Sequence, residues 1–267
     1  MTRFFMLLFV LSLPFWIAGA VFQSPGSMPM DMPVSAFQFV LPIVVASVCS
    51  YRDDGVRGLA ALLRRTFSVP GRGQRVWWVP VVLLVPAAMA LSYGVLPLAG
   101  VPLGGPHEPL AAVPVLLAVY AVAAVCEEAG WMSYVLRPLQ HRWGVLGGGV
   151  ALGVVWAAWH VVAYIQGGHT ALWIAGQCLS TVALRVLMVW LFQHTGQAVI
   201  PTVVIHILVN VSQSVFPDYP GRPLAAVAFG LVTAAAATIV TLVWRPRTPT
   251  GSSSESAVPR RLRQGSL

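Results

Sequence analysis

The sequence has very little charge and contains no lysine. Only 9% of its 267 residues are charged, eight of them are acidic, and all sixteen basic residues are arginines. Hydrophobic residues make up 57% of the chain, and the mean hydropathy is +0.78. A soluble globular domain carries about 25% charged residues. This composition excludes that class and indicates an integral membrane protein.

Cysteine is also scarce, which excludes a fold built on disulfides. The three cysteines are Cys49, Cys126 and Cys178, and each falls within or at the end of an apolar run. A disulfide framework requires several cysteines at regular spacings in extracellular segments. Three thiols inside or at the ends of apolar runs do not fit that pattern, so the sequence implies no disulfide framework.

What the sequence has in abundance is long apolar runs, of which we count eight. They cover about residues 4–22, 34–50, 77–99, 110–133, 145–165, 171–192, 198–215 and 224–244. A helix needs about 20 apolar residues to cross the hydrocarbon core of a bilayer. We therefore predict an all-α, polytopic membrane protein of about eight transmembrane helices, forming a single domain over residues 1–244. The first run also resembles a signal peptide, but it is long enough to span, which favours an uncleaved helix.

The arginines lie between the runs in an asymmetric pattern. They gather in segments 52–75 and 137–142 and in the tail, whereas the intervening segments on the other side contain Arg222 alone. By the positive-inside rule both termini are cytoplasmic and the protein lies in the cell membrane. Topology and anionic lipid explain the net charge of +8, so no nucleic-acid partner is expected. Residues 245–267, rich in Ser, Pro and Arg, are predicted to be a disordered cytoplasmic tail.

The segment between the second and third runs is too polar to span. Residues 51–75 place several leucines and valines at helical spacing opposite arginines. This pattern fits a short helix in the inner interface. A solvated loop with a helical turn fits it equally well.

A small set of polar residues lies inside the apolar runs. They are Glu127, Glu128, His160, Arg185, His206 and Asn210. An ionisable side chain near the bilayer centre costs at least about 2.5 kcal/mol, so its presence requires a partner or a function. His206 and Asn210 are four residues apart and share one helix face, as do Trp156 and His160. We expect these helices to bring the set together in one pocket inside the bundle.

This set is sufficient for peptide hydrolysis. A carboxylate in an apolar surround can take a proton from water. Imidazoles and a carboxamide can donate hydrogen bonds to an oxyanion. Other interpretations are open: one carboxylate and two imidazoles can bind zinc, the same residues can relay protons in a transporter, and each can be only a packing partner between helices. Arg185 either extends to the interface or pairs with Glu128.

Three motifs in the sequence resemble those of a known family. The stretch "EEAGWMSYVLRPL" from Glu127, the pair Trp156-x-x-x-His160 and the pair His206-x-x-x-Asn210 resemble the CPBP family, the CAAX proteases and bacteriocin-processing enzymes, including the CAAX prenyl protease 2 type. The resemblance covers about residues 110–215. It implies an intramembrane endopeptidase in which Glu127 activates water.

The resemblance also implies roles for the other site residues. His160 and His206 would support the water and the oxyanion, Asn210 would help to form the oxyanion hole, and Glu128 completes the catalytic set. No cofactor is required by this mechanism, although a divalent metal such as zinc is not excluded. The expected partners are the lipid bilayer and a membrane-associated protein or peptide substrate, cut at or below the inner interface. The motifs do not indicate the oligomeric state.

One position departs from the family pattern. The first motif usually reads Glu-Glu-x-x-x-Arg, and Met132 occupies the arginine position here; Trp156 stands where Phe is common. Met132 cannot pair with Glu128, which would then be protonated, poorly held, or paired with Arg185 or Arg137. The departure leaves a second function open, that of a non-catalytic family member acting as a membrane partner-binding or immunity factor.

Overall fold

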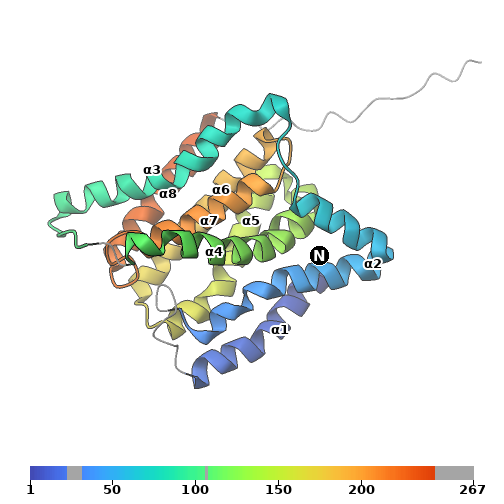
Figure 1. The fold of residues 1–267 in the computed structure, drawn as a ribbon, viewed down its shortest axis with the longest axis horizontal. Helices are drawn as coiled ribbons and strands as arrows, with labels where there is room; N and C mark the ends of the chain where they lie inside the picture. Colours follow the sequence, from blue (N-terminus) through green and yellow to red (C-terminus); the bar gives the residue numbers. More distant parts are fainter. Residues whose placement is uncertain (23–31, 106–107, 244–267) are drawn as a thin grey trace, which may run out of the picture.

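The computed structural model describes residues 1–22, 32–105 and 108–243, and over these ranges the regular structure is entirely helical. The all-α prediction is confirmed. The α-helices, drawn in Figure 1, are α1 (Thr2–Val21), α2 (Leu41–Thr66), α3 (Trp78–Val95), α4 (Val113–Glu128), α5 (Leu136–Gln166), α6 (Ala171–His194), α7 (Ile200–Val215) and α8 (Pro223–Val243). Shorter elements are η2 (Val34–Val40), η3 (Arg72–Trp77), η4 (Pro97–Ala99), η5 (Leu110–Ala112) and η6 (Ala129–Val135). The predicted tail, 245–267, lies outside the described residues.

Six helical stretches in the described ranges are long and apolar enough to cross a membrane, so the polytopic prediction is confirmed. One of them, Leu110–Gln166, contains both the fourth and the fifth predicted runs, and α7 falls below the length of a full span. Within α5 the chain bends at Gly144, whose φ of 72° is a left-handed conformation that favours glycine. The exact figure of eight crossings remains a prediction.

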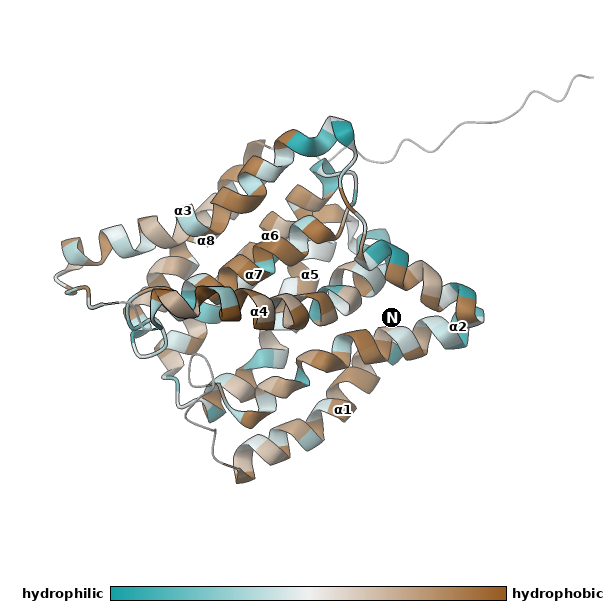
Figure 2. Ribbon diagram, in the orientation of Figure 1, coloured by the Kyte–Doolittle hydropathy of each residue, from teal (hydrophilic) through white to brown (hydrophobic). Residues whose placement is uncertain are grey.

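The polar segment that follows the second run is helical. Helix α2 continues through it after a break at Asp54 and Gly55, where Gly55 has a φ of 59°. Leu62 on this part is buried, whereas Val56 is 71% exposed. The hydrophilic ends of α2 and of the α3 region lie on the same side of the molecule, as Figure 2 shows. The helix is therefore present, and its position in the inner interface stays a prediction.

Small residues let several helices approach closely, as is common in membrane bundles. A Cβ on Gly176 of α6 would lie 2.6 Å from backbone atoms of Ala226 in α8, and one on Gly153 of α5 would lie 2.9 Å from Cα of Val182 in α6. Gly153 thus brings α5 close to α6. These contacts hold α5, α6 and α8 together behind the site.

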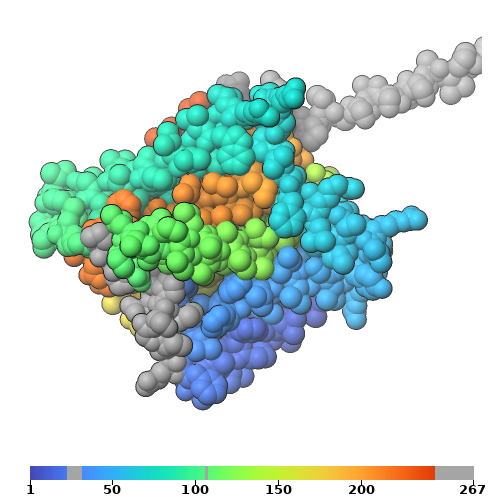
Figure 3. Space-filling model, viewed as in Figure 1, coloured from blue at the N-terminus to red at the C-terminus, as the bar shows by residue number. Residues whose placement is uncertain are grey.

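Helix α4 lies between two packed groups of helices. A first apolar core joins α1, α2, η6 and α5, with Phe4, Trp131 and Trp159 fully buried in it. A second joins α3, α6, α7 and α8 around Met89 and Phe229. Figure 3 shows α4 crossing the visible face between these groups. Because α4 ends with Glu127 and Glu128, this position brings both acids to the middle of the bundle.

Candidate active site

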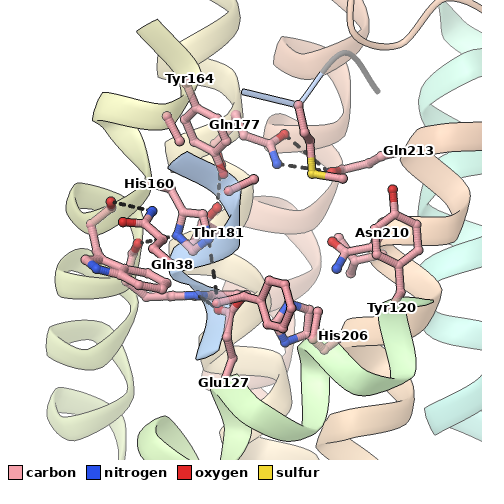
Figure 4. A pocket seen from close by; sticks show the side chains of 18 of the residues that line it. Gln38, Tyr120, Glu127, His160, Tyr164, Gln177, Thr181, His206, Asn210 and Gln213 are labelled. Carbon is pink, nitrogen blue, oxygen red and sulfur yellow. Dashed lines mark hydrogen bonds and ion pairs between the residues drawn. The ribbon is translucent and has the colours of Figure 1, made fainter. Parts of the chain in front are cut away.

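A pocket of about 420 Å³ lies beside the end of α4. Side chains from η2, α4, α5, α6 and α7 line it, and Figure 4 shows the polar ones. Glu127, His160, His206 and Asn210 are all among the lining residues. Four of the five predicted site residues, from the three helices α4, α5 and α7, therefore face one cavity. The prediction that they meet in one pocket is confirmed for these four.

Two indole groups hold the carboxylate of Glu127. Trp156 Nε1 donates to Glu127 Oε2 at 2.8 Å, and Trp131 Nε1 donates to the same oxygen at 3.3 Å. Glu127 is only 5% exposed. Hydrogen bonds to a buried carboxylate stabilise its charged form. The two tryptophans thus orient the acid within an apolar region.

His160 faces the same carboxylate oxygen. Its Nδ1 lies 2.9 Å from the carbonyl oxygen of Trp156, one turn earlier on α5. Since a carbonyl only accepts, Nδ1 carries a proton. Nε2 then points to Glu127 Oε2 at 3.9 Å, too far for a direct hydrogen bond. Because 3.9 Å is less than twice a hydrogen-bond length, a water bonded to both atoms would have to lie to one side of the line that joins them.

Glu128 does not line the pocket but lies behind it, fully buried. Arg185 of α6 binds both of its oxygens, with Nη1 donating to Oε2 at 2.6 Å and Nη2 to Oε1 at 3.1 Å. His206 Nδ1 lies 2.9 Å from Oε1. Of the partners left open by the sequence, Arg185 is thus the one that pairs with Glu128, while Arg137 donates to Gln197.

The arginine is held in turn by Trp156. Its guanidinium carbon lies 4.0 Å from the centre of the indole ring, and a cation over an aromatic face is attracted by the ring. The same indole donates to Glu127 from its edge. Trp156 therefore contacts Glu127 directly and contacts the arginine that binds Glu128.

Met132, at the family's arginine position, packs elsewhere. It is 1% exposed and belongs to the apolar core formed with α1 and α2. The buried Glu128 nevertheless has a bidentate arginine. The departure in the first motif therefore does not leave this carboxylate unpaired.

His206 and Asn210 approach the pocket from α7. The His206 ring packs edge-on against Trp156, with centroids 5.0 Å apart. Asn210 lies one turn further along, beside Tyr120 in Figure 4. Its backbone carbonyl accepts from Ser214, whose hydroxyl lies 2.7 Å from that of Tyr120. Both polar side chains face the cavity that Glu127 lines, as their spacing of four predicted.

The chain changes its helical form directly after the glutamates. Residues Ala129–Val135 form a π-helix, η6. Such segments are rare and occur frequently at functional sites. Gly130 within it lies so close to α2 that a Cβ would be 2.6 Å from Cβ of Pro42. Because no single residue type signals a π-helix, the sequence did not predict this element.

A second polar group lines the pocket farther from Glu127. The side chains of Gln177 and Gln213 donate to each other at 3.2 and 3.3 Å, and the Tyr219 hydroxyl donates to Gln177 Oε1 at 2.7 Å. The sequence did not single out these glutamines or Trp131, and it identified Trp156 by its spacing from His160 and not as a hydrogen-bond donor. Two glutamines inside apolar runs were the available signal, since a buried amide needs hydrogen-bond partners.

A metal site is a separate question. Among the residues that the structure describes, no three His, Cys, Asp or Glu side chains are grouped as metal ligands. His206 already uses Nδ1 on Glu128. The zinc interpretation therefore has no three-ligand group in the described ranges to support it.

Comparison with known proteins gives two similarities. A family profile described as "Type II CAAX prenyl endopeptidase Rce1-like" matches residues 109–212, the stretch that contains the five predicted site residues. A curated relative, the CAAX prenyl protease 2 of Methanococcus maripaludis, is 22% identical over 230 residues, covering 79% of this chain and 82% of the relative. The similarity to this relative thus extends well beyond the profile match.

Proposed function

We propose that this chain, which belongs to the CPBP family of membrane proteases, is an intramembrane endopeptidase that cuts a membrane-associated protein or peptide with Glu127 as general base. The observation that carries the proposal is the geometry around this carboxylate. Two indoles hold one of its oxygens, and His160 Nε2 faces that oxygen at 3.9 Å. A water held beside the acid and the imidazole can donate one hydrogen to the carboxylate and the other to Nε2.

In the reaction, Glu127 takes a proton from this water as the water oxygen bonds to the peptide carbonyl carbon. The tetrahedral intermediate then carries an oxyanion. Its C–N bond breaks as the proton passes from Glu127 to the leaving nitrogen. Proton transfer by a positioned group of this kind contributes about 10²- to 10⁴-fold to rate.

His206 and Asn210 are the groups we assign to the oxyanion. The carboxamide of Asn210 is a donor without any change of charge. His206 donates from Nδ1 to Glu128, so its Nε2 can donate as well only when the ring is doubly protonated.

Glu128 and Arg185 act on the reaction through His206 in this proposal. Glu128 has no access to the pocket, because it is fully buried and bound by both the guanidinium and the imidazole. It orients the ring of His206 toward the cavity. We therefore regard Glu128 and Arg185 as positioning residues, whereas Glu127, His160, His206 and Asn210 would touch water or substrate.

The non-catalytic alternative rested on the loss of the motif arginine at Met132. Arg185 provides an arginine for the same carboxylate from another helix. The departure is therefore not evidence for lost activity. A partner-binding function stays as the outcome if the protein cleaves nothing.

The experiment compares the termini of membrane proteins in cells that carry the wild type or Glu127→Gln at equal levels. Gln keeps the size of the side chain but is not a base. New termini that require Glu127 would establish the peptidase and identify a substrate. The same termini in both strains, with the variant folded, would contradict the mechanism. Cleavage by purified protein after treatment with a metal chelator separates the glutamate mechanism, which should persist, from a metal-dependent one.

A further inference from the structure

The two glutamines that line the pocket form a reciprocal amide pair between α6 and α7. Gln177 Nε2 donates to Gln213 Oε1 at 3.2 Å, and Gln213 Nε2 donates to Gln177 Oε1 at 3.3 Å. The two residues are only 6% and 2% exposed. Each side-chain amide has two hydrogens to donate and two lone pairs that accept. The reciprocal bonds therefore use half of the hydrogen-bonding capacity of the pair.

Tyr219 satisfies one edge of the pair. Its hydroxyl donates to Gln177 Oε1 at 2.7 Å and accepts from Gln213 Nε2 at 3.3 Å. Tyr219 is fully buried and does not line the pocket. It is held in turn by Trp173, whose Nε1 donates to its carbonyl oxygen at 3.0 Å. The edge that Tyr219 satisfies is thus the one on the side away from the cavity.

The other edge of the pair consists of Gln177 Nε2 and Gln213 Oε1, and we call it the pocket edge. It lies opposite Tyr219, and both glutamines line the cavity, as Figure 4 shows. In the part of the chain that the structure describes, Gln213 Oε1 accepts from Gln177 alone. The hydroxyl of Tyr164, another lining residue, interacts with the Gln177 side chain and can itself donate into the cavity. The pocket edge therefore presents an acceptor with a donor beside it.

The pocket edge follows the residues that we assign to the oxyanion. His206, Asn210 and Gln213 have the spacing i, i+4, i+7, which places them along one stripe of α7. A helix rises about 1.5 Å per residue, so Gln213 lies roughly 4.5 Å beyond Asn210 along the axis. An extended chain covers about 3.3 Å per residue. A chain whose scissile carbonyl lies at Asn210 thus has a residue one or two positions away beside the pocket edge.

One residue of an extended polypeptide matches this edge. In an antiparallel ladder, two opposed residues exchange both an N–H and a C=O hydrogen bond. The pocket edge offers the same two partners, with Gln177 Nε2 and Gln213 Oε1 3.2 Å apart. Backbone groups in an apolar region need partners of this kind. A carboxylate fits less well, because it has no hydrogen for Gln213 Oε1.

We propose that the pocket edge is a substrate-binding subsite, which pairs with the N–H and C=O of one extended substrate residue, one or two positions from the scissile bond. The position relative to the scissile bond rests on the proposed peptidase function, whereas recognition of a backbone does not. A pair that only joined α6 to α7 would be packing between helices. Such a pair would show no preference for a peptide group, so binding separates the two roles.

A small backbone mimic tests the subsite without any need for cleavage. The probe is N-acetyl-leucine methylamide, which carries the N–H and C=O of one residue and an apolar side chain. The control probe has an ester oxygen in place of the leucine N–H, so it cannot donate to Gln213 Oε1. Both are added to detergent-solubilised Glu127→Gln, which lacks the base. The rise in melting temperature with probe concentration gives each dissociation constant.

Two further variants are made in the same Glu127→Gln background. The double change Gln177→Met with Gln213→Met removes both amides and keeps the length of the side chains. Replacing both partners of a hydrogen bond by apolar groups of similar shape can be nearly neutral for stability. The matched control is Leu184→Met, which also introduces a methionine into the pocket wall on α6 but leaves the pair intact.

We expect the amide probe to bind the intact pair roughly 3- to 10-fold tighter than the ester, the effect of losing one hydrogen bond. Leu184→Met should keep this ratio, and the double methionine variant should reduce it to one. Equal binding of the two probes to the intact pair, or no binding of either, would overturn the proposal. A ratio that survives the loss of both amides would overturn it too. The first two outcomes are read without the double variant, so they decide even if that variant does not fold.

The comparison of termini between wild type and Glu127→Gln separates this inference from the proposed function. A preference for the amide probe without any new termini would overturn the peptidase and leave a backbone-binding site in a partner-binding protein. Termini that require Glu127, without a preference between the probes, would overturn the subsite and leave the peptidase standing. A preference together with such termini would support both.

Discussion

Trp156 connects the two glutamates of this site although it carries no charge. Its N–H donates to Glu127 at 2.8 Å, and its ring lies under the guanidinium that holds Glu128. Phenylalanine, common at this position in the family, has a ring but no donor. The indole of Trp156 thus donates a hydrogen bond to Glu127 and packs against the Arg185 guanidinium, whereas a phenylalanine ring could only pack.

Trp156→Phe should separate these two contributions. Losing a hydrogen bond to a charged group costs about 1.5 kcal/mol, which corresponds to a roughly tenfold lower kcat if Glu127 is the base. The phenyl ring retains the packing against Arg185, so the melting temperature should change little. Cleavage kinetics and thermal unfolding in detergent measure the two effects. An unchanged kcat would show that the indole N–H does not support the base.

Arg185 should contribute to stability because it is the cation for a buried acid. Arg185→Met leaves Glu128 charged and without its arginine, which should lower the free energy of unfolding by about 3–5 kcal/mol. The control is the double change Arg185→Met with Glu128→Gln, which removes both charges and should recover most of that loss. Thermal or denaturant unfolding measures the free energy of unfolding of the single and double variants for this comparison. Equal stability of the single and double variants would contradict the ion pair.

Met132→Arg tests whether the usual family arginine has been replaced functionally. Met132 is 1% exposed in an apolar core, and Glu128 already receives donors from Arg185 and His206. A second arginine there has no acid to pair with, so we expect destabilisation by more than about 3 kcal/mol. Met132→Leu, which keeps size and polarity, should cost less than about 1.5 kcal/mol. A higher melting temperature for Met132→Arg would mean that Glu128 still lacks a partner.

At the level of elements, the π-helix η6 determines where the glutamates lie relative to α2. Gly130 allows η6 to contact Pro42 at the start of α2, where a Cβ would lie 2.6 Å from the proline Cβ and 2.9 Å from its carbonyl oxygen. Backbone and ring atoms at these positions cannot move aside easily. An added methyl group must therefore displace η6, and with it the end of α4.

Gly130→Ala should accordingly reduce activity more than stability. Overpacking costs about 1–3 kcal/mol, whereas a displacement of 1 Å at a catalytic group can lower the rate on the order of 100-fold. Gly94→Ala in α3 is the matched control, because a Cβ there meets no atom within 4 Å. It should leave activity unchanged and slightly raise stability. Full activity of Gly130→Ala would show that η6 does not set the position of Glu127.

At the scale of the whole molecule, α1 is part of the core although it could be read as a signal peptide. Phe4 and Leu8 are fully buried, and Ser12 accepts a hydrogen bond from Trp159 Nε1 at 2.8 Å. Trp16 Nε1 donates to Gln38 Oε1, also at 2.8 Å. Trp159 and Gln38 both line the pocket. Helix α1 therefore supports the pocket wall from behind.

A chain that lacks residues 1–22 should fail to accumulate as a folded protein. Its removal exposes the buried face of α5 and leaves Trp159 and Gln38 without these partners, which is costly inside a membrane. Yield in membranes and elution by size exclusion measure the outcome. The control is Met6→Ala on the outer face of α1, where Met6 is 63% exposed; this variant should accumulate normally. A truncated protein with wild-type yield and cleavage would contradict the role of α1.

The sequence was a good guide to some features of the site and a poor one to others. Intramembrane Glu127, His160, His206 and Asn210 stood out because ionisable and polar residues are costly in an apolar run. Trp131 did not, and Trp156 stood out only through its spacing from His160, since tryptophan is ordinary in a membrane helix and its N–H partner depends on packing. Gln177 and Gln213 satisfy the same polarity criterion, since each is a polar residue inside an apolar run.

The sequence by itself determined the class of protein, the helical segments, the arginine asymmetry and the residue types of the site. These follow from composition and local hydropathy, which fix whether a segment can reside in lipid. Only the tertiary structure decided that Arg185 pairs with Glu128 across 57 residues and that Glu128 lies behind the pocket. Those features depend on how helices pack against each other, which no local property of the chain contains.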